Sequence, residues 1–185
     1  MIRRRFIGPG VAIALAFCGL VALTSAEAAP SPKGAECTLT GSATISPGLT
    51  QKAQNEAIRL SDVKLANCRG GALTSPNTTV LSATVSTSPN PTYATASCAK
   101  GNLALNATIF WSNGTRTSAT ITTTGVAANQ AIKGTVTSST NPSLPAKSTV
   151  AGDVAFKPTT TAQNCVQVPV TAVTFQGVLI SGQPK

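Results

Sequence analysis

Most catalytic sites are built from carboxylates and histidines, and this chain offers few of either. It has no histidine among its 185 residues and only five acidic residues. The lack of histidine excludes a Ser-His-Asp triad, a Cys-His dyad and a histidine-ligated zinc site. Outside residues 1–28, which are treated below as a signal peptide, the carboxylates are Glu36, Glu56, Asp62 and Asp153. A glycosidase needs two carboxylates about 5–9 Å apart across a sugar, and Glu56 and Asp62 could in principle approach each other because both lie in or beside the second expected strand. We expect both to be solvated residues.

Metal and cofactor chemistry is not indicated by any motif. The chain has no Gly-x-Gly-x-x-Gly fingerprint and no phosphate-binding loop, and its few acidic residues do not cluster as a calcium loop requires. We therefore expect no metal, no cofactor and no enzymatic activity. A hydrolase remains the least favoured alternative.

The cysteines indicate disulfide bonds. After residue 28 they are Cys37, Cys68, Cys98 and Cys165. An even number in an exported domain favours two disulfides, and a metal site is disfavoured because no Cys-x-x-Cys pair occurs. If two antiparallel strands place Ile45 opposite Leu60, then Cys37 lies opposite Cys68 and within disulfide reach. We therefore predict the bonds Cys37–Cys68 and Cys98–Cys165.

Three aromatic residues are the candidates for ligand contacts. Phe110 and Trp111 are adjacent in an expected strand and so face opposite sides of the sheet. Trp111 shares its face with an apolar row, so we expect it in the core, whereas Phe110 points to the opposite side of the sheet. Tyr93 follows a Pro-rich loop. An exposed aromatic ring among Asn and Thr side chains could stack on a sugar.

The net charge of +9 suggests anionic partners. An anionic cell-wall polymer, a polysaccharide or a surface protein would fit such a charge. The basic residues are scattered and form no block, and aromatic residues are only 4% of the chain. Nucleic-acid binding is therefore not expected, because it combines basic stripes with aromatic platforms.

Residues 1–28 read as a signal peptide. Arg3, Arg4 and Arg5 precede an apolar run that is shorter than the roughly 20 residues of a spanning helix. Small residues at Ala26 and Ala28 fit a cleavage site after residue 28. We expect general secretion, with twin-arginine export as the alternative, and no transmembrane anchor after cleavage. The mature protein would lie outside the cell or in its envelope.

Alternating apolar residues predict strands along the rest of the chain. Residues 29–35 read as a flexible arm and residues 36–182 as a single domain. The predicted strands cover residues 37–45, 58–65, 81–85, 103–111, 119–123, 132–136, 150–156, 166–170 and 173–179. A change of phase near Ser61 and Asp62 suggests a β-bulge. Asn113-Gly114 predicts a type I′ hairpin, and residues 50–59 are the only helix candidate.

About nine strands in one domain predict an all-β fold. We expect an antiparallel β-sandwich, immunoglobulin-like or jelly-roll-like, with two disulfides, and a β-barrel is the alternative.

Residues 37–50, with Ile109-Phe-Trp-Ser-Asn-Gly114 and Phe175-Gln-Gly177, resemble a loose group of small exported actinobacterial proteins. That resemblance implies an exported β-sandwich and no particular activity. In composition the chain also resembles the actinobacterial apo-chromoproteins, which are carriers with two disulfides, although it is longer and basic.

Two functions follow as expectations. The first is a non-enzymatic binding or surface-structural module of the cell exterior. The second is an extracellular carrier of an apolar small molecule, which a densely filled core would exclude and a cavity of roughly 300 Å³ or more would support.

Overall fold

The computed structural model describes residues 35–69, 81–126 and 128–182. The expected signal peptide and residues 29–34 of the expected arm lie outside the described residues. Residue 35, the last of that arm, is already part of the fold. Ala35 is buried, its N–H donates to Ser181 Oγ at 3.1 Å, and its carbonyl accepts a bond from Ser181 N.

The described residues form nine strands and no helix. The strands are β1 Glu36–Leu49, β2 Gln54–Arg69, β3 Leu81–Ser88, β4 Thr92–Ala96, β5 Gly101–Trp111, β6 Arg116–Val126, β7 Asn129–Ser139, β8 Thr149–Pro158 and β9 Val170–Gly182. This confirms the all-β prediction. β-branched residues, which suit a pleated surface, are frequent in β6, β7 and β9, whereas β2 has only Ile58 and Val63 among its 16 residues.

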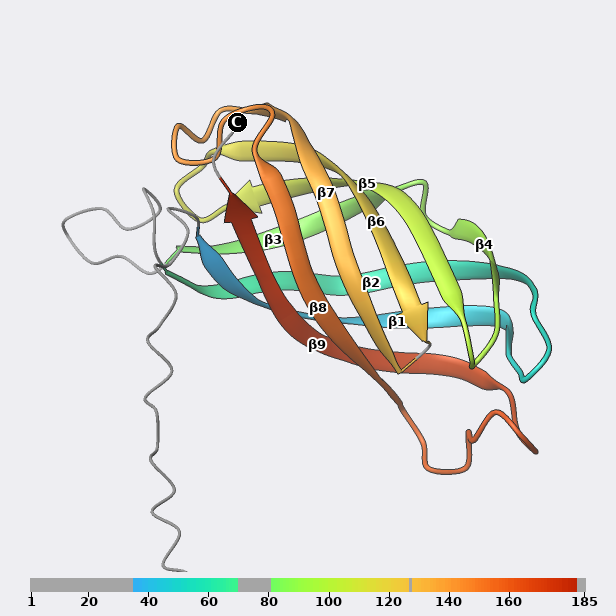
Figure 1. The fold of residues 1–185 in the computed structure, drawn as a ribbon. Helices are drawn as coiled ribbons and strands as arrows, with labels where there is room; N and C mark the ends of the chain where they lie inside the picture. The colour runs from blue at the N-terminus through green and yellow to red at the C-terminus, as the bar shows by residue number, and fades with distance from the viewer. Residues whose placement is uncertain (1–34, 70–80, 127, 183–185) are drawn as a thin grey trace, which may run out of the picture. The chain divides into compact units, whose positions relative to one another are not determined.

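The sheet closes on itself as an eight-stranded barrel. Its order is β1-β9-β8-β7-β6-β5-β3-β2, and β1 also pairs with β2, while β4 adds to the edge of β2. Every pairing is antiparallel. In Figure 1, β7, β8 and β9 form the wall nearest the viewer, and β1 and β2 cross behind them. The expected sandwich is therefore wrong and the barrel alternative is correct, because β1 pairs on both of its sides and leaves no break between two layers.

Two bulges in β2 set the register that brings the first cysteine pair together. Between the pairs Ile45–Ile58 and Glu36–Arg69, β2 uses two more residues than β1. The two irregularities coincide with Asp62 and Asn67, which both have φ of 53°. The bulge near Asp62 is confirmed, but the expected pairing of Ile45 with Leu60 is wrong, since Ile45 lies opposite Ile58.

Both predicted disulfides are present. Cys37–Cys68 joins β1 to β2 with a Cα–Cα distance of 4.1 Å, and Cys98–Cys165 joins two loops with 6.2 Å. The pairing Cys37–Cys68 survives the local error in register because the two extra residues of β2 lie between Ile58 and Cys68. Two disulfides fit an oxidising compartment.

Three other local predictions are wrong. Residues 54–59 of the helix candidate belong to β2, which is paired with both β1 and β4. Residues 166–169 are loop rather than strand, and Asn164 Oδ1 accepts bonds from the backbone N–H groups of Val166, Gln167 and Val168. The Asn113-Gly114 hairpin is confirmed, but only Gly114 has positive φ, 81°, so the turn is not type I′.

The core lies inside the barrel as two clusters. One surrounds Trp111 and the Cys37–Cys68 disulfide, and the other surrounds Ile45 and Leu49. Leu60 and Phe156 are partly buried and pack against both clusters. Within the described part of the chain, no helix has the length and apolarity to cross a membrane.

Candidate ligand-binding cavity

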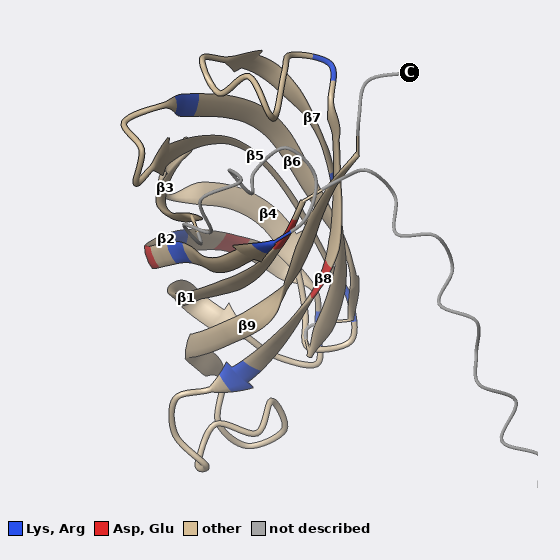
Figure 2. Cartoon of the chain, turned by 90° about the vertical axis from the view of Figure 1, so that its left-hand side faces the viewer, with Lys and Arg blue, Asp and Glu red and all other residues tan. Residues whose placement is uncertain are grey.

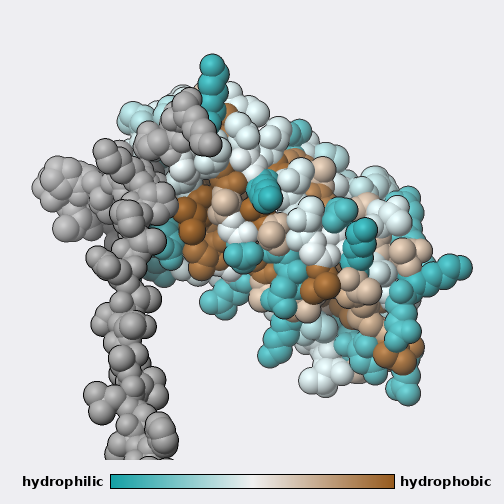
Figure 3. Space-filling model, in the orientation of Figure 1, coloured by the Kyte–Doolittle hydropathy of each residue, from teal (hydrophilic) through white to brown (hydrophobic). Residues whose placement is uncertain are grey.

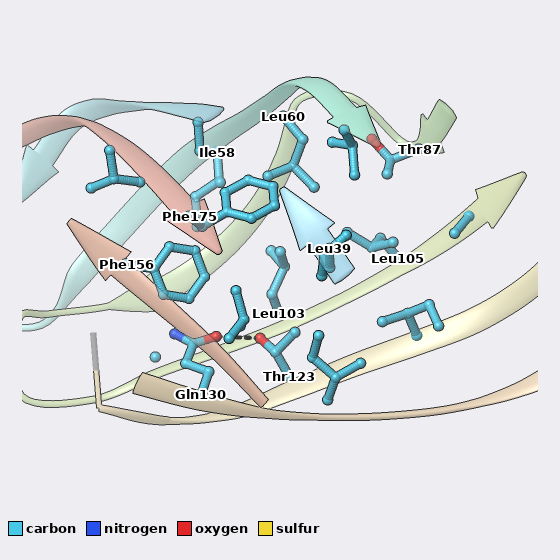
Figure 4. Close-up of a pocket in the computed structure, with 18 of the residues that line it drawn as sticks. Leu39, Ile58, Leu60, Thr87, Leu103, Leu105, Thr123, Gln130, Phe156 and Phe175 are labelled. Carbon is cyan, nitrogen blue, oxygen red and sulfur yellow. Dashed lines mark hydrogen bonds between the residues drawn. The ribbon is translucent and has the colours of Figure 1, made fainter. Parts of the chain in front are cut away.

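A cavity of about 150 Å³ lies inside the barrel between the two core clusters. Figure 4 shows its wall, to which Leu39, Leu60, Leu103, Leu105, Phe156 and Phe175 contribute side chains from five strands. The volume is about half of the roughly 300 Å³ expected for a drug-sized ligand. A cavity of about 150 Å³ lined by Leu, Ile and Phe is large enough to hold benzene.

The inward rows leave space because several of their positions carry small residues. Ala43 and Ala107 line the cavity where larger side chains could stand. On β1, Gly41 faces the ring of Phe175 on β9, and a Cβ at residue 41 would lie 2.3 Å from Phe175 Cζ. The Phe175 ring therefore occupies the space beside β1 and does not extend across the barrel.

Several apolar side chains of the wall remain partly exposed although they point inward. They are Ile58, Leu60, Val85, Leu103, Leu105, Ile121, Phe156 and Leu179. Inward-pointing residues of a filled barrel would be buried. Their exposure therefore indicates room inside the barrel that protein atoms do not fill.

The largely apolar wall includes a few polar residues, of which Thr123 and Gln130 form a hydrogen-bonded pair. Thr123 near the end of β6 donates a hydrogen bond from Oγ1 to Oε1 of Gln130 near the start of β7 (Figure 4). Thr123 is buried and Gln130 is half-buried. We call this part of the barrel the Gln130 end. No Lys, Arg, Asp or Glu lines the cavity among the described residues, so a charged group placed there would lose its hydration without a partner.

The opposite end, which we call the Trp111 end, is filled by side chains. Trp111 Nε1 donates to Thr117 Oγ1 at 3.0 Å, and Thr117 Oγ1 lies 2.8 Å from Ser139 Oγ. Leu144, in the loop between β7 and β8, is buried in the same cluster as Trp111. None of these side chains lines the cavity, so the interior is plugged at the Trp111 end and hollow towards the Gln130 end.

The structure does not bring the three candidate aromatics together. Trp111 is 5% exposed and points inward, whereas Phe110 is 40% exposed with Arg116 at 4.8 Å over its ring. Tyr93, on β4, is 67% exposed. Through the register, Phe110 lies level with Lys64 of β2 and Tyr93 with Ala57. These two positions are about 20 Å apart along the strand.

The carboxylates do not converge either. Glu56 and Asp62 lie on the same strand, about 20 Å apart along it. The expectation that Glu56 is solvated is wrong, since its side chain is fully buried. Its Oε2 accepts a bond from Gly48 N and its Oε1 from Gln54 Nε2, both at 2.9 Å. Glu56 thus holds the turn between β1 and β2.

Two Ser-x-x-Lys spacings occur in the described residues, and neither forms a dyad. In Ser97-Cys-Ala-Lys100, Ser97 Oγ accepts bonds from the backbone N–H groups of Ala99 and Lys100, and the Lys100 side chain is exposed. In Ser61-Asp-Val-Lys64, the Ser61 hydroxyl is hydrogen-bonded to the Ser42 hydroxyl at 2.9 Å, and the Lys64 side chain is exposed. Among the described residues no group of three or more His, Cys, Asp or Glu could hold a metal.

In Figure 2, Lys and Arg are spread over several strands and loops, and on β2 blue and red segments lie close together. Figure 3 shows small apolar areas separated by hydrophilic residues. Val178 and Ile180 of β9 are exposed by 40% and 38%. Neither feature selects a binding surface as clearly as the cavity does.

The residues that line the polar part of the cavity were absent from the candidates chosen from the sequence. The alternation of inward and outward positions along the strands could have identified them. Thr123 follows Ala119 and Ile121 in an inward row, and Gln130 precedes Ile132 at the same spacing. No protein-family model, curated protein or solved structure matches this chain.

Proposed function

We propose that this protein is a non-enzymatic binding module of the cell exterior or envelope that carries a small apolar molecule inside its barrel. The observation that carries the proposal is the aliphatic cavity towards the Gln130 end. Eight-stranded barrels have an interior that side chains either fill or leave open for one small ligand. Here the side chains fill only the Trp111 end.

The ligand is small. Burial of apolar surface contributes roughly 25 cal/mol per Å², so even a molecule of six or seven carbons gains several kcal/mol on entry. A preformed cavity adds to this because little of the wall has to be ordered on binding.

Export agrees with this role. The two disulfides connect strands and loops of the barrel, which favours an oxidising compartment. The leader predicted for residues 1–28 would deliver the chain there. A carrier outside the cytoplasm needs a stable shell and no cofactor.

Adhesion to an anionic wall polymer, a polysaccharide or a surface protein remains a prediction from the net charge. It can be tested by retention on insoluble cell wall at low and high salt. Retention that disappears with salt would reflect charge alone.

The carrier proposal is tested by titrating the ¹⁵N-labelled protein with benzene and toluene and following amide shifts. We expect saturable shifts at residues of β5, β6 and β7 that line the cavity. Two Ala→Phe variants of the same strand provide the comparison. Ala107 is buried and lines the cavity, whereas Ala104 is exposed and points outward.

Ala107→Phe should abolish the shifts because its ring fills the cavity, and Ala104→Phe should leave them unchanged. Leu105→Phe adds less volume to the same wall, and it replaces Ala107→Phe as the cavity-filling variant if Ala107→Phe does not fold. Shifts that do not saturate, or that persist in a folded filled variant, would contradict the proposal.

A further inference from the structure

We propose that the molecule in the cavity carries a carbonyl oxygen, which accepts a hydrogen bond from Gln130 Nε2. The ligand class is thus a small uncharged carbonyl compound with an apolar body of about six carbons. The inference rests on the proposed function and adds the chemistry that the cavity selects.

The Gln130 amide is oriented by its neighbour on β6. The hydroxyl of Thr123 donates to Gln130 Oε1. This bond engages the oxygen of the amide and leaves the nitrogen as the group that can face a ligand. Thr123 is 8% exposed, so its hydroxyl is held inside the wall of the barrel. The pair is therefore organised as a donor site before any ligand enters.

The amide nitrogen of Gln130 has no hydrogen-bond partner among the described residues. Within the described residues, Gln130 Nε2 makes no hydrogen bond, although the side chain lines the cavity. A donor that becomes buried without an acceptor is destabilising. A ligand that covers this nitrogen with apolar atoms would incur that cost, whereas a ligand with an acceptor avoids it.

A glycine beside Gln130 leaves the amide nitrogen accessible. Gly101 begins β5 beside Gln130, and a Cβ there would lie 3.0 Å from Gln130 Nε2. Any larger side chain would cover the amide. With glycine at residue 101, the nitrogen stays open to the space that Leu103 and Phe156 also line (Figure 4).

The lining also excludes charged ligands. None of the described lining residues is ionisable, so neither a carboxylate nor an ammonium group would find a counter-charge. A neutral acceptor remains, and a carbonyl oxygen is the strongest that can enter with a compact apolar body. Of the other polar lining residues, Asn102 is exposed, and Thr87 and Ser97 carry hydroxyls, which can accept as well as donate, whereas the amide nitrogen of Gln130 can only donate.

Three probes of equal size test this inference. Cyclohexanone presents an acceptor, cyclohexanol presents both a donor and an acceptor, and methylenecyclohexane presents neither. Each is titrated by NMR into the wild-type protein, Gln130→Met and the matched control Gln167→Met, whose residue is exposed in a loop.

The quantity compared is the Kd for methylenecyclohexane divided by the Kd for cyclohexanone. This ratio cancels the general preference of the cavity for apolar molecules. A single hydrogen bond contributes about 0.5–1.5 kcal/mol, so Gln130→Met should lower the ratio about twofold to tenfold. Gln167→Met should leave it unchanged. Thr123→Val should lower it by a smaller factor, because the amide is then no longer held.

The outcomes separate the two proposals. If all probes bind but the ratio is the same in Gln130→Met, the carbonyl inference is wrong and the carrier function stands. If cyclohexanol alone depends on Gln130, the site offers an acceptor and the inference is likewise wrong. If no probe binds, the carrier function itself fails. Should Gln130→Met not fold, the side-chain amide signals of Gln130 in the wild-type protein give the same answer. They should shift downfield with cyclohexanone and not with methylenecyclohexane.

Discussion

Phe175 on β9 lies across Gly41 on the neighbouring strand β1, so closely that a Cβ at residue 41 would be 2.3 Å from Phe175 Cζ. The two residues are directly paired in the sheet, and Phe175 is only 8% exposed. The contact places a large ring against the wall of the barrel. The cavity beside it depends on this arrangement.

Replacing Gly41 with Ala should force the Phe175 ring towards the cavity. We expect a loss of about 1–3 kcal/mol in the free energy of unfolding, as for other overpacked cores. Denaturant unfolding measures it. In the double variant with Phe175→Leu, part of the loss should be recovered because the clash is removed. Strictly additive effects would show that the two residues do not interact in this way.

Glu56 should stabilise the turn between β1 and β2 through its two hydrogen bonds. Glu56→Ala leaves Gly48 N and Gln54 Nε2 without this acceptor in a buried place, and we expect a loss of about 2–3 kcal/mol in unfolding free energy. Asp153→Ala removes an exposed carboxylate of β8 and is the control. It should change stability by no more than about 0.5 kcal/mol. Equal effects of the two variants would refute a special role for Glu56.

Trp111 is the single tryptophan of the chain, so its fluorescence reports directly on the closed end of the barrel. Its burial predicts a blue-shifted emission that acrylamide quenches weakly. Trp111→Phe removes the bond to Thr117, which is fully buried, and should cost about 1–3 kcal/mol.

The neighbouring Phe110 provides the contrast for that variant. Phe110→Leu alters an outward ring whose contact with Arg116 is worth about 0.5–1 kcal/mol. A Trp111 emission maximum typical of a solvent-exposed tryptophan would reverse the assignment of inner and outer faces. So would a larger loss of unfolding free energy for Phe110→Leu than for Trp111→Phe.

The Cys98–Cys165 bond should contribute mainly by restricting the unfolded chain. Its sequence separation is 67 residues, for which the chain-entropy account gives about 4 kcal/mol. The double variant Cys98→Ser/Cys165→Ser should lower unfolding free energy by up to that amount while keeping the barrel. A thiol assay of the denatured wild-type protein tests both bonds. Reactive thiol at any of these four cysteines before reduction would contradict the pairing.

Local features were predictable from the sequence where neighbouring residues determine them. The inward row of β5 from Leu103 to Trp111 follows from strict alternation, and the bulge at Asp62 from a change of phase. The short strand β4 was missed because it lies between turns and carries no apolar row. Its partner, β2, determines that it is a strand at all.

The choice between sandwich and barrel could not be made from the sequence. Both folds alternate inward and outward residues along each strand, so their patterns are the same. The difference lies in the pairing of β1 with both β9 and β2, which joins residues far apart in the chain.

The cavity could not be predicted from the sequence either. It results from small residues such as Ala43 and Ala107 that line the same interior from different strands, and each alone is an ordinary strand residue. The polar pair of Thr123 and Gln130 becomes meaningful only when β6 and β7 bring the two side chains together.

A crystal of the protein pressurised with xenon tests the carrier account most directly. Xenon binds in apolar cavities of this size. The account predicts a xenon peak inside the barrel, in contact with Leu103, Leu105 and Ile121, that disappears in Ala107→Phe or Leu105→Phe. If the crystal of the wild-type protein holds no xenon inside the barrel, and inward side chains fill the interior there as in the variants, the account is contradicted.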